Sequence, residues 1–408
     1  MISVDEALAI VRREAPVLPV EEVALEEALH RVLGEDVAAD ADMPPFDRAA
    51  MDGYALRAAD VGALPAVLAV VGEARAGSWP EGGVGPGQAV RIMTGAPVPP
   101  GATAVQPVEK TRSREDGRVE IVSPVEERAN IAARACEVRA GDVVLERGRV
   151  ISPAAIAVLA SVGRARVRVG RRPRLALLVT GDELVDVVEF PRPGQIRNSN
   201  GPALAALARL AGADVRVLGV APDRVEALAD ALRGGLPADV LVVSGGVSAG
   251  DYDLVEPVLA DLGVTFLFTQ VAIKPGAPLV FGRRGPTLVF GLPGNPVSSL
   301  VTFDLFVRAA LLQMQGARVL ERPLVEVELE EAVKNRSGRR AYLPARVRSQ
   351  EGRLVARPLR STGSADVVAH ARANALVILE AERTRAEPGE RTPAVLAPGF
   401  LEDDGAPL

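Results

Sequence analysis

Cysteine and histidine are almost absent from the chain, whose 408 residues contain only Cys136, His30 and His370. A structural zinc cluster or a disulfide framework needs several such residues, so neither is expected. A Ser-His-Asp or Cys-His enzyme would have to use one of the two histidines, and neither lies near a nucleophile elbow. The scarcity therefore argues against zinc-bound, disulfide-linked and triad-hydrolase classes.

Long apolar runs and basic blocks are also missing. No uninterrupted apolar stretch approaches ~18 residues, so no membrane span is expected. The amino terminus lacks a cationic segment followed by an apolar run, which argues against a signal peptide and for a cytoplasmic protein. The net charge is −6, from 47 basic and 53 acidic residues. Without a basic block, nucleic acid is not an expected partner.

Lysine occurs at only three positions, 110, 274 and 334. Most lysines are solvated at the surface, but Lys274 lies between Ile273 and Pro275 in an apolar, proline-rich loop. A single cation in such a setting favours the binding of a phosphate or another oxyanion. Lys274 is therefore a candidate anion-binding residue.

The chain is too long for one hydrophobic core, so several domains are expected. A capping box at 3–6 predicts a first helix to about Glu14, and the pattern at 23–33 predicts a second. Short alternating runs between proline and glycine clusters at 42–141 predict a small β-rich domain. A helix that begins with proline is predicted at 153–162.

Residues 174–314 alternate between apolar strand-like runs and helical segments, which predicts a parallel, doubly wound sheet. Beyond a linker at 321–323, shorter alternating runs predict a small antiparallel barrel or sandwich. The fold class is thus multidomain, with a central α/β domain and flanking β-rich parts. The expected central strands are 174–179, 214–220, 238–243, 264–273 and 286–290, and the expected helices are 201–211, 224–233, 252–262 and 296–314.

Loops rich in glycine, proline or acid follow these five strand-like runs directly. In an open α/β sheet, ligands bind in the crevice beyond the carboxyl ends of the strands, so we expect the loops to build one polar pocket. The loops are 180–183, 221–223, 244–251, 274–276 and 291–296.

Two of the loops have the features of an anion site. Gly245 and Gly246 let the backbone approach a ligand, and free amides near a helix start attract phosphate, although simple turn chemistry is the alternative. Pro296 fits the first turn of a long helix with Asn295 as N-cap, which leaves the amides before it facing the crevice. The alternative for this second loop is a rigid connection.

Carboxylates follow the other strands, with Glu183 and Asp223 beyond two of them and Asp251 at a helix start. Acids beside phosphate-binding amides repel the ligand unless a divalent cation lies between them, which favours Mg²⁺. The alternatives are a turn role for Asp223, a cap of the next helix for Asp251 and helix capping by Asp182.

Six motifs, in order, resemble those of the molybdopterin molybdenumtransferase family, which includes the E domain of gephyrin. Segment 44–54 (Pro-Pro-Phe-Asp-Arg-Ala-Ala-Met-Asp-Gly-Tyr) and segment 91–97 (Arg-Ile-Met-Thr-Gly-Ala-Pro) are similar to two of them. The resemblance runs essentially from end to end of the chain. The other four matching segments are 180–184, 245–252, 273–276 and 291–298.

The resemblance implies an elongated four-part subunit and a homodimer, with a pocket between the α/β domain of one subunit and the β-rich domain of the other. The family reaction takes adenylylated molybdopterin, molybdate and Mg²⁺, and it releases AMP and molybdenum cofactor. A molybdopterin adenylyltransferase would hand over the pterin. The implied domains are 1–41 with 140–172 (linker), 42–139 (inserted, β-rich), 173–321 (α/β, molybdopterin-binding) and 322–408 (C-terminal, β).

Residue roles also follow from the resemblance, motif by motif. Because the dithiolene of the substrate supplies sulfur, no cysteine or histidine ligands are needed. Glu183 and Asp251 are the implied Mg²⁺ ligands, and Lys274, Arg339 and Ser364 would face molybdate. The implied catalytic residues are Asp52, Thr94, Glu183, Asp223 and Asp251. The implied substrate-binding residues are Gly245, Gly246, Ser248, Lys274, Pro275, Pro293, Gly294, Pro296, Arg339 and Ser364.

Some positions depart from the family pattern. Glu137 stands where the family usually has aspartate, which moves the carboxylate outward. Ala277 and Gln270 stand where members carry further lysines, so the anion site is less cationic unless Arg339 compensates. Arg224 stands where many members show a second acid.

Three other functions are alternatives to the transferase. A scaffold that binds pterin or a receptor tail without turnover would not need acids at 52, 183, 223 and 251. The related adenylyltransferase shares the α/β domain but lacks the flanking domains. A tungsten-specific enzyme is not separated from a molybdenum enzyme by the sequence, because molybdate and tungstate have nearly the same size and charge.

Overall fold

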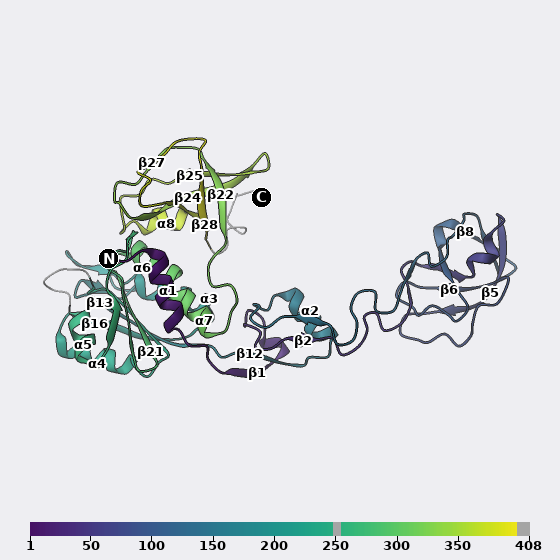
Figure 1. Cartoon of the computed structure of the whole chain (residues 1–408), viewed down its shortest axis with the longest axis horizontal. Helices are drawn as coiled ribbons and strands as arrows, with labels where there is room; N and C mark the ends of the chain where they lie inside the picture. Colours follow the sequence, from purple (N-terminus) through teal and green to yellow (C-terminus); the bar gives the residue numbers. More distant parts are fainter. Residues whose placement is uncertain (248–253, 398–408) are drawn as a thin grey trace. The chain divides into compact units, whose positions relative to one another are not determined.

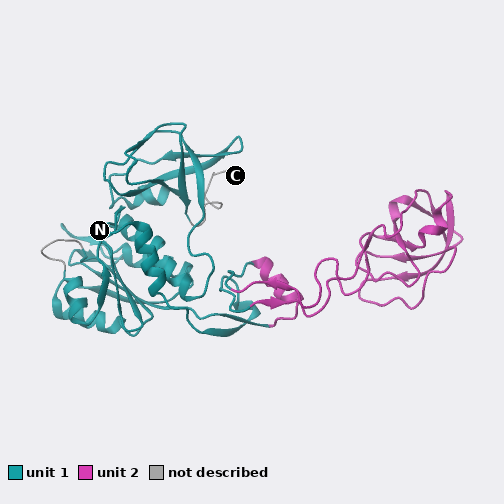
Figure 2. Ribbon diagram, in the orientation of Figure 1, with its two compact units in different colours: residues 1–35, 148–152, 166–408 teal, residues 36–147, 153–165 magenta. Residues whose placement is uncertain are grey.

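The computed structural model describes residues 1–247 and 254–397 and divides into two compact units (Figures 1 and 2). Unit 1 contains an α/β domain and a C-terminal barrel, and unit 2 is rich in β-strands. Unit 1 consists of residues 1–35, 148–152 and 166–408, and unit 2 of residues 36–147 and 153–165.

The α/β domain is built on a six-stranded sheet in the order β16-β13-β17-β21-β20-β18. Strands β16, β13, β17 and β21 run parallel, while β20 is antiparallel to both of its neighbours. The doubly wound, mostly parallel sheet is therefore confirmed. The bounds are β13 Arg174–Thr180, β16 Asp214–Ala221, β17 Val240–Ser244, β18 Thr265–Phe268, β20 Val280–Arg284 and β21 Thr287–Leu292.

Helices cover both faces of this sheet. Because successive side chains of a strand point to opposite faces, Leu175 and Leu177 of β13 lie in one core and Ala176 and Leu178 in the other. The first core also contains residues of α1, α3, α6 and α7, and the second contains residues of α4 and α5. The bounds are α1 Val4–Glu14, α3 Asn200–Leu210, α4 Val225–Gly235, α5 Val255–Asp261, α6 Pro296–Thr302 and α7 Arg308–Met314.

Helices α6 and α7 are joined through the π-helical turn Phe303–Val307 into one helix. Among the described residues, this helix at Pro296–Met314 is the one that is long and apolar enough to cross a membrane by length and composition. Of its most apolar window, 67% is buried inside the structure, and Phe303 and Phe306 are fully buried. Its apolar composition is that of a core helix.

The C-terminal part of unit 1 is a closed five-stranded barrel, which confirms the expected small barrel. Its first strand, β22, pairs antiparallel with β28 but parallel with β25, so the barrel is not antiparallel throughout as expected. The short strand β19, Ile273–Lys274, joins the same sheet by pairing parallel with β24. The barrel strands are β22 Leu324–Leu329, β24 Arg340–Gln350, β25 Arg353–Pro358, β26 Ala375–Leu379 and β28 Arg391–Leu396, with α8 at Val367–Arg372.

Unit 2 contains a second six-stranded sheet, in the order β7-β4-β6-β5-β9-β8. Its β-rich character agrees with the short alternating runs of the sequence. The predicted helix that begins with proline is present as α2, Pro153–Ser161. The strands are β4 Gly53–Leu56, β5 Ala66–Ala74, β6 Gln88–Ile92, β7 Ala104–Pro107, β8 Thr111–Ser113 and β9 Arg118–Ile121.

The helix expected at 23–33 is wrong. This segment contains the end of a strand, β1 Val20–Ala24, and a short 3-10 turn at Leu25–Glu27. Strand β1 pairs antiparallel along its whole length with β12, Arg166–Gly170. Pairing with a segment about 145 residues away in the chain thus overrides a local preference for helix, as tertiary context often does.

The single strand expected at 264–273 is also wrong, and one strand was missed. Strand β18 ends at Phe268, and the chain then leaves the α/β sheet, with Ala272 N donating to Ile2 O at 2.7 Å before β19 joins the barrel sheet. Strand β20 follows a proline-rich loop and forms a hairpin with β21 around Gly285. The sequence did not reveal this hairpin, because the expected strand began only at 286.

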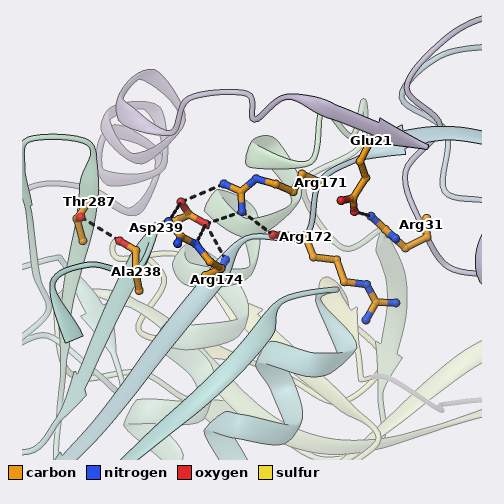
Figure 3. A network of polar contacts seen from close by, with 8 residues as sticks. All are labelled: Glu21, Arg31, Arg171, Arg172, Arg174, Ala238, Asp239 and Thr287. Atoms are coloured by element: carbon orange, nitrogen blue, oxygen red, sulfur yellow. Dashed lines mark hydrogen bonds and ion pairs between the residues drawn. The ribbon is translucent and has the colours of Figure 1, made fainter. Parts of the chain in front are cut away.

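A polar network fixes the start of strands β13 and β17 (Figure 3). The carboxylate of Asp239 accepts two hydrogen bonds of 3.0 Å from the guanidinium of Arg171 and one of 2.8 Å from the backbone N–H of Arg174. Burial alone raises the pKa of Asp239, but the hydrogen bonds from both arginines outweigh it and lower the pKa to about 2. In the same view, Thr287 Oγ1 donates to the carbonyl oxygen of Ala238 at 2.9 Å.

We expect Asp239→Asn to lower the thermal unfolding temperature of the protein at neutral pH. The free energy of unfolding should fall by about 1–2 kcal/mol. The folded pKa of about 2 lies below the ordinary 3.8, so this stabilisation is present above about pH 4 and is lost as the pH falls toward 2. The difference between variant and wild type should therefore shrink on acidification. The exposed Asp230→Asn is the control and should change little. A difference that is constant with pH would contradict the assignment.

Candidate functional site

A cavity of about 870 Å³ opens in unit 1 beyond the carboxyl ends of the parallel strands. Every one of the five predicted loops contributes to its wall, and the barrel adds Arg339 and Ser364. The structure thus brings these loops together as the sequence predicted. The predicted site residues that line the cavity are Glu183, Asp223, Gly245, Gly246, Lys274, Pro275, Pro293, Gly294, Pro296, Arg339 and Ser364.

Four predicted site residues are not among these. Ser248 and Asp251 lie outside the described residues. Asp52 and Thr94 belong to unit 2, where they are bonded to each other.

The topology of the sheet explains why the cavity lies where it does. From β13 the chain moves outward to β16, and it then returns to place β17 on the other side of β13. Loops that leave neighbouring strands in opposite directions leave a crevice at this switch point. The carboxyl ends of β13 and β17 supply Thr180 and Ser244 to the wall of that crevice.

The acidic loops differ in how their carboxylates are used. Asp223 accepts from Thr180 Oγ1 and from the backbone N–H of Asp182, whose own carboxylate accepts from Asp223 N at 3.1 Å. Asp182 therefore holds the neighbouring loop at Asp223 in place. Its alternative role as a helix cap is wrong. The Glu183 side chain makes no hydrogen bond or ion pair with any described residue. Among the described residues of the cavity wall, Glu183 is the carboxylate that is left available to a ligand.

Gly245 shows why the loop after β17 needs glycine. Its φ of +104° lies in the left-handed region, and a Cβ there would be 2.4 Å from the carbonyl oxygen of Thr180. The backbone of this loop is thereby packed directly on the end of β13. The loop backbone, and not a side chain, faces the cavity at this point.

A buried polar network under the loops was missed by sequence reasoning. Asn200 Nδ2 donates to Ser244 Oγ at 2.9 Å and to the carbonyl oxygen of Gly294 at 2.8 Å, and Ser299 lies beside them. Ser244 and Ser299 are fully buried, and Asn200 is 9% exposed. This network joins α3, β17 and α6 and fixes the turn at Gly294. An asparagine at a helix start gave no signal of burial.

The turn before α6 matches the prediction in position but not in its cap. Asn295 is the N-cap residue, yet its side chain donates to Ser364 Oγ at 2.9 Å and does not cap the helix. The N–H of Val297 is taken by the carbonyl oxygen of Ser364 at 2.9 Å. The amides of Gly294 and Asn295 make no hydrogen bond within the described part of the chain, so they remain available to an anion.

Two cations reach the cavity from the barrel sheet. Lys274 is exposed at the end of β19, where Ile273 pairs with Arg340, so Arg339 is a close neighbour. The loop that carries Arg339 is held by the fully buried Asn335, which donates to the carbonyl oxygen of Arg339 at 2.7 Å. A third cation, Arg197 on β15 (Ile196–Arg197), also lines the cavity and was not predicted.

The ligand groups of the cavity suit Mg²⁺ better than a metal ion whose ligands all come from the protein. No group of three or more His, Cys, Asp or Glu residues is placed to hold a metal ion in residues 1–247 and 254–397. Mg²⁺ is usually bound by one or two carboxylates plus substrate phosphates. The available carboxylate of Glu183, beside amides that suit an anion, meets that need.

In unit 2, Asp52 and Thr94 are bonded to each other, a contact that the motifs did not predict. The carboxylate of Asp52 accepts from the N–H and from the hydroxyl of Thr94, both at 2.7 Å. Both bonds lower the pKa of Asp52, and the bond from the backbone N–H has the larger effect. The carboxyl group therefore stays ionised. Glu137, the departure from the family pattern, forms an ion pair of 2.6 Å with Arg48.

The fold and the cavity define a multidomain α/β protein with a polar crevice that is suited to anions. Family models match most of the chain in three stretches. They are the MoeA N-terminal region (domain I and II) at residues 2–163, the probable molybdopterin binding domain at 176–313 and the MoeA C-terminal region (domain IV) at 326–396.

Relatives match over nearly the full length. The molybdopterin molybdenumtransferase of Staphylococcus aureus is 35% identical over 383 residues, which is 93% of this chain and 91% of the relative. That of Bacillus subtilis is 36% identical over 413 residues, 99% and 95% of the two chains. The crystal structure of a molybdopterin biosynthesis moeA protein from Pyrococcus horikoshii OT3 has a TM-score of 0.82 at 30% identity and covers 97% of this chain and 100% of its own. The chain belongs to the molybdopterin molybdenumtransferase family.

Proposed function

We propose that this protein inserts molybdenum from molybdate into adenylylated molybdopterin and hydrolyses the phosphoanhydride to release AMP and molybdenum cofactor. The observation that carries the proposal is the match to transferases over nearly the whole chain, together with a crevice that combines cations and open amides. Both substrates are anions, and such groups stabilise anions most strongly in a partly closed site.

The cations and the amides have separate tasks in this proposal. Lys274, Arg339 and Ser364 bind molybdate in this proposal, which is supported by their shared position in the cavity wall. Backbone groups bind the pterin nucleotide, with prolines shaping the wall. The residues of this second group are Gly245, Gly246, Ser248, Pro275, Pro293, Gly294 and Pro296.

Mg²⁺ is the proposed cofactor, with Glu183 and Asp251 as its protein ligands. Glu183 is supported by its available carboxylate in the cavity wall. When bound, Mg²⁺ would neutralise phosphate charge that Glu183 and Asp223 otherwise repel. Asp223 orients the acidic loop through its bonds to Thr180 and Asp182.

The remaining parts of the proposal rest on the family resemblance. A homodimer would let Asp52 of the partner subunit and Thr94 of the partner subunit act in the reaction. A molybdopterin adenylyltransferase would supply the pterin. The cytoplasmic location and the choice of molybdenum over tungsten stay predictions. The proposed domains keep the bounds 1–41 with 140–172, 42–139, 173–321 and 322–408.

The test is the release of AMP by the purified protein when it is given adenylylated molybdopterin, molybdate and Mg²⁺. Asp52→Ala and Asp251→Ala serve as inactive controls, because both acids are assigned to the reaction. Release by the wild type that stays at the level of these controls would contradict the transferase. If the wild type then still bound the pterin, a scaffold would be the better description.

A further inference from the structure

Arg197 is a cation of the cavity wall to which no role has yet been assigned. It lines the cavity with Lys274 and Arg339. It makes no ion pair with any residue in 1–247 or 254–397, and its Nε donates to the carbonyl oxygen of Glu189 at 2.9 Å. A guanidinium has five N–H donors, so this single bond orients the group and leaves donors for a ligand.

The backbone of Arg197 is held firmly on its strand. The amides of its neighbours Ile196 and Asn198 donate at 2.8 and 2.9 Å to carbonyl oxygens of the segment 183–185. These bonds belong to the parallel pairing of β15 with β14, Leu184–Val185. Arg197 is therefore fixed beside the segment that carries Glu183.

The same segment is also tied to the turn before α6. Asn200, three residues after Arg197, donates to the carbonyl oxygen of Gly294 at 2.8 Å. Three residues span at most ~10 Å, and Arg197 and Gly294 both line the cavity. The turn presents the amides of Gly294 and Asn295, which have no partner in the part of the chain that the structure describes.

Lys274 and Arg339 lie on the barrel side of the cavity. Lys274 is on β19, which pairs with β24, and Arg339 is in the loop that leads into β24. Arg197 instead lies on β15, which pairs with β14 in the α/β domain. The cavity thus contains two cationic positions on two different parts of unit 1.

We propose that Arg197 and the amides of Gly294 and Asn295 form a second anion subsite, which binds the pyrophosphate group of the nucleotide-bearing pterin. Lys274 and Arg339 then serve the oxyanion, and Ser364, whose Oγ accepts from Asn295 Nδ2 at 2.9 Å, lies where the two subsites meet. This assignment rests on the proposed function, which requires a pyrophosphate and molybdate in one cavity.

The test measures the binding of inorganic pyrophosphate and of molybdate, separately, by titration calorimetry at one fixed Mg²⁺ concentration. Arg197→Ala should weaken pyrophosphate binding about tenfold or more, the loss typical of a charge-assisted hydrogen bond, and leave molybdate binding unchanged. Arg197→Lys should recover part of the affinity, because it keeps the charge. Thermal unfolding tests whether each variant is folded. If Arg197→Ala is not folded, the comparison is made with Arg197→Lys.

Arg192→Ala is the matched control. Arg192 is an exposed arginine five residues before Arg197, and it does not line the cavity. It should bind both anions like the wild type. The proposal is overturned if Arg197→Ala binds pyrophosphate normally, if it loses both anions equally, or if the wild type binds no pyrophosphate. If the wild type released AMP and Arg197→Ala bound pyrophosphate normally, only the subsite would be refuted. Binding through Arg197 without AMP release would sink only the proposed reaction.

Discussion

Glu183→Gln is expected to lower the rate of AMP release by about 10³-fold, the scale of loss when a key charge of an active site is removed. The substitution keeps the size of the side chain and removes the one cavity carboxylate that no described residue engages. Without it, Mg²⁺ would lose a protein ligand beside the substrate phosphates. Single-turnover assays of AMP formation, run over a range of Mg²⁺ concentrations, would measure the effect.

The matched control for this prediction is Glu189→Gln. Glu189 lies six residues after Glu183 in the chain, is exposed and does not line the cavity. It should therefore retain the full rate. If Glu183→Gln kept its rate at all Mg²⁺ concentrations, neither the metal nor the catalytic role of Glu183 would stand.

Lys274→Ala should raise the molybdate concentration needed for half-maximal turnover by about 10- to 100-fold, because it removes a charge-assisted hydrogen bond to a dianion. The affinity for the pterin nucleotide should change much less. Lys274 is exposed at the end of β19 and makes no ion pair with any described residue, so its removal should leave the fold intact. Titrating molybdate in the AMP assay, with pterin binding measured in parallel, separates the two effects.

Lys334→Ala provides the control for the loss of a lysine, since Lys334 is an exposed residue of the same barrel outside the cavity. Lys274→Arg should retain most of the molybdate affinity. Equal weakening of molybdate and pterin binding by Lys274→Ala would refute the specific role of Lys274.

Patterns of local origin were predicted well. Ser3 accepts from Glu6 N at 3.1 Å, as its capping-box pattern indicated, and Pro296 begins its helix as expected. The apolar runs of β13 and β17 were read correctly, because strands buried on both faces of a parallel sheet are apolar along their whole length. These features depend on a few neighbouring residues, and the sequence displays them directly.

Features that depend on distant pairing were not predicted. The strand β1 was taken for part of a helix because its partner β12 is far away in the chain. Lys274 was expected in a loop just beyond the end of an α/β strand, and it lies instead on a short strand of the barrel sheet. Arg197 was not singled out at all. No local pattern distinguishes an arginine in a cavity from the many arginines at the surface.

The sequence by itself determined the alternation of strands and helices in most of the central domain, the five loops beyond its strands and the family to which their motifs point. Only the tertiary structure decided which of those loop residues are available. Asp223 is engaged by Thr180 and Asp182, whereas Glu183 is not. It also decided that Asn200 is buried against Gly294. Hydrogen bonds between segments far apart in the chain set these differences, and such bonds exist only once the segments have packed together.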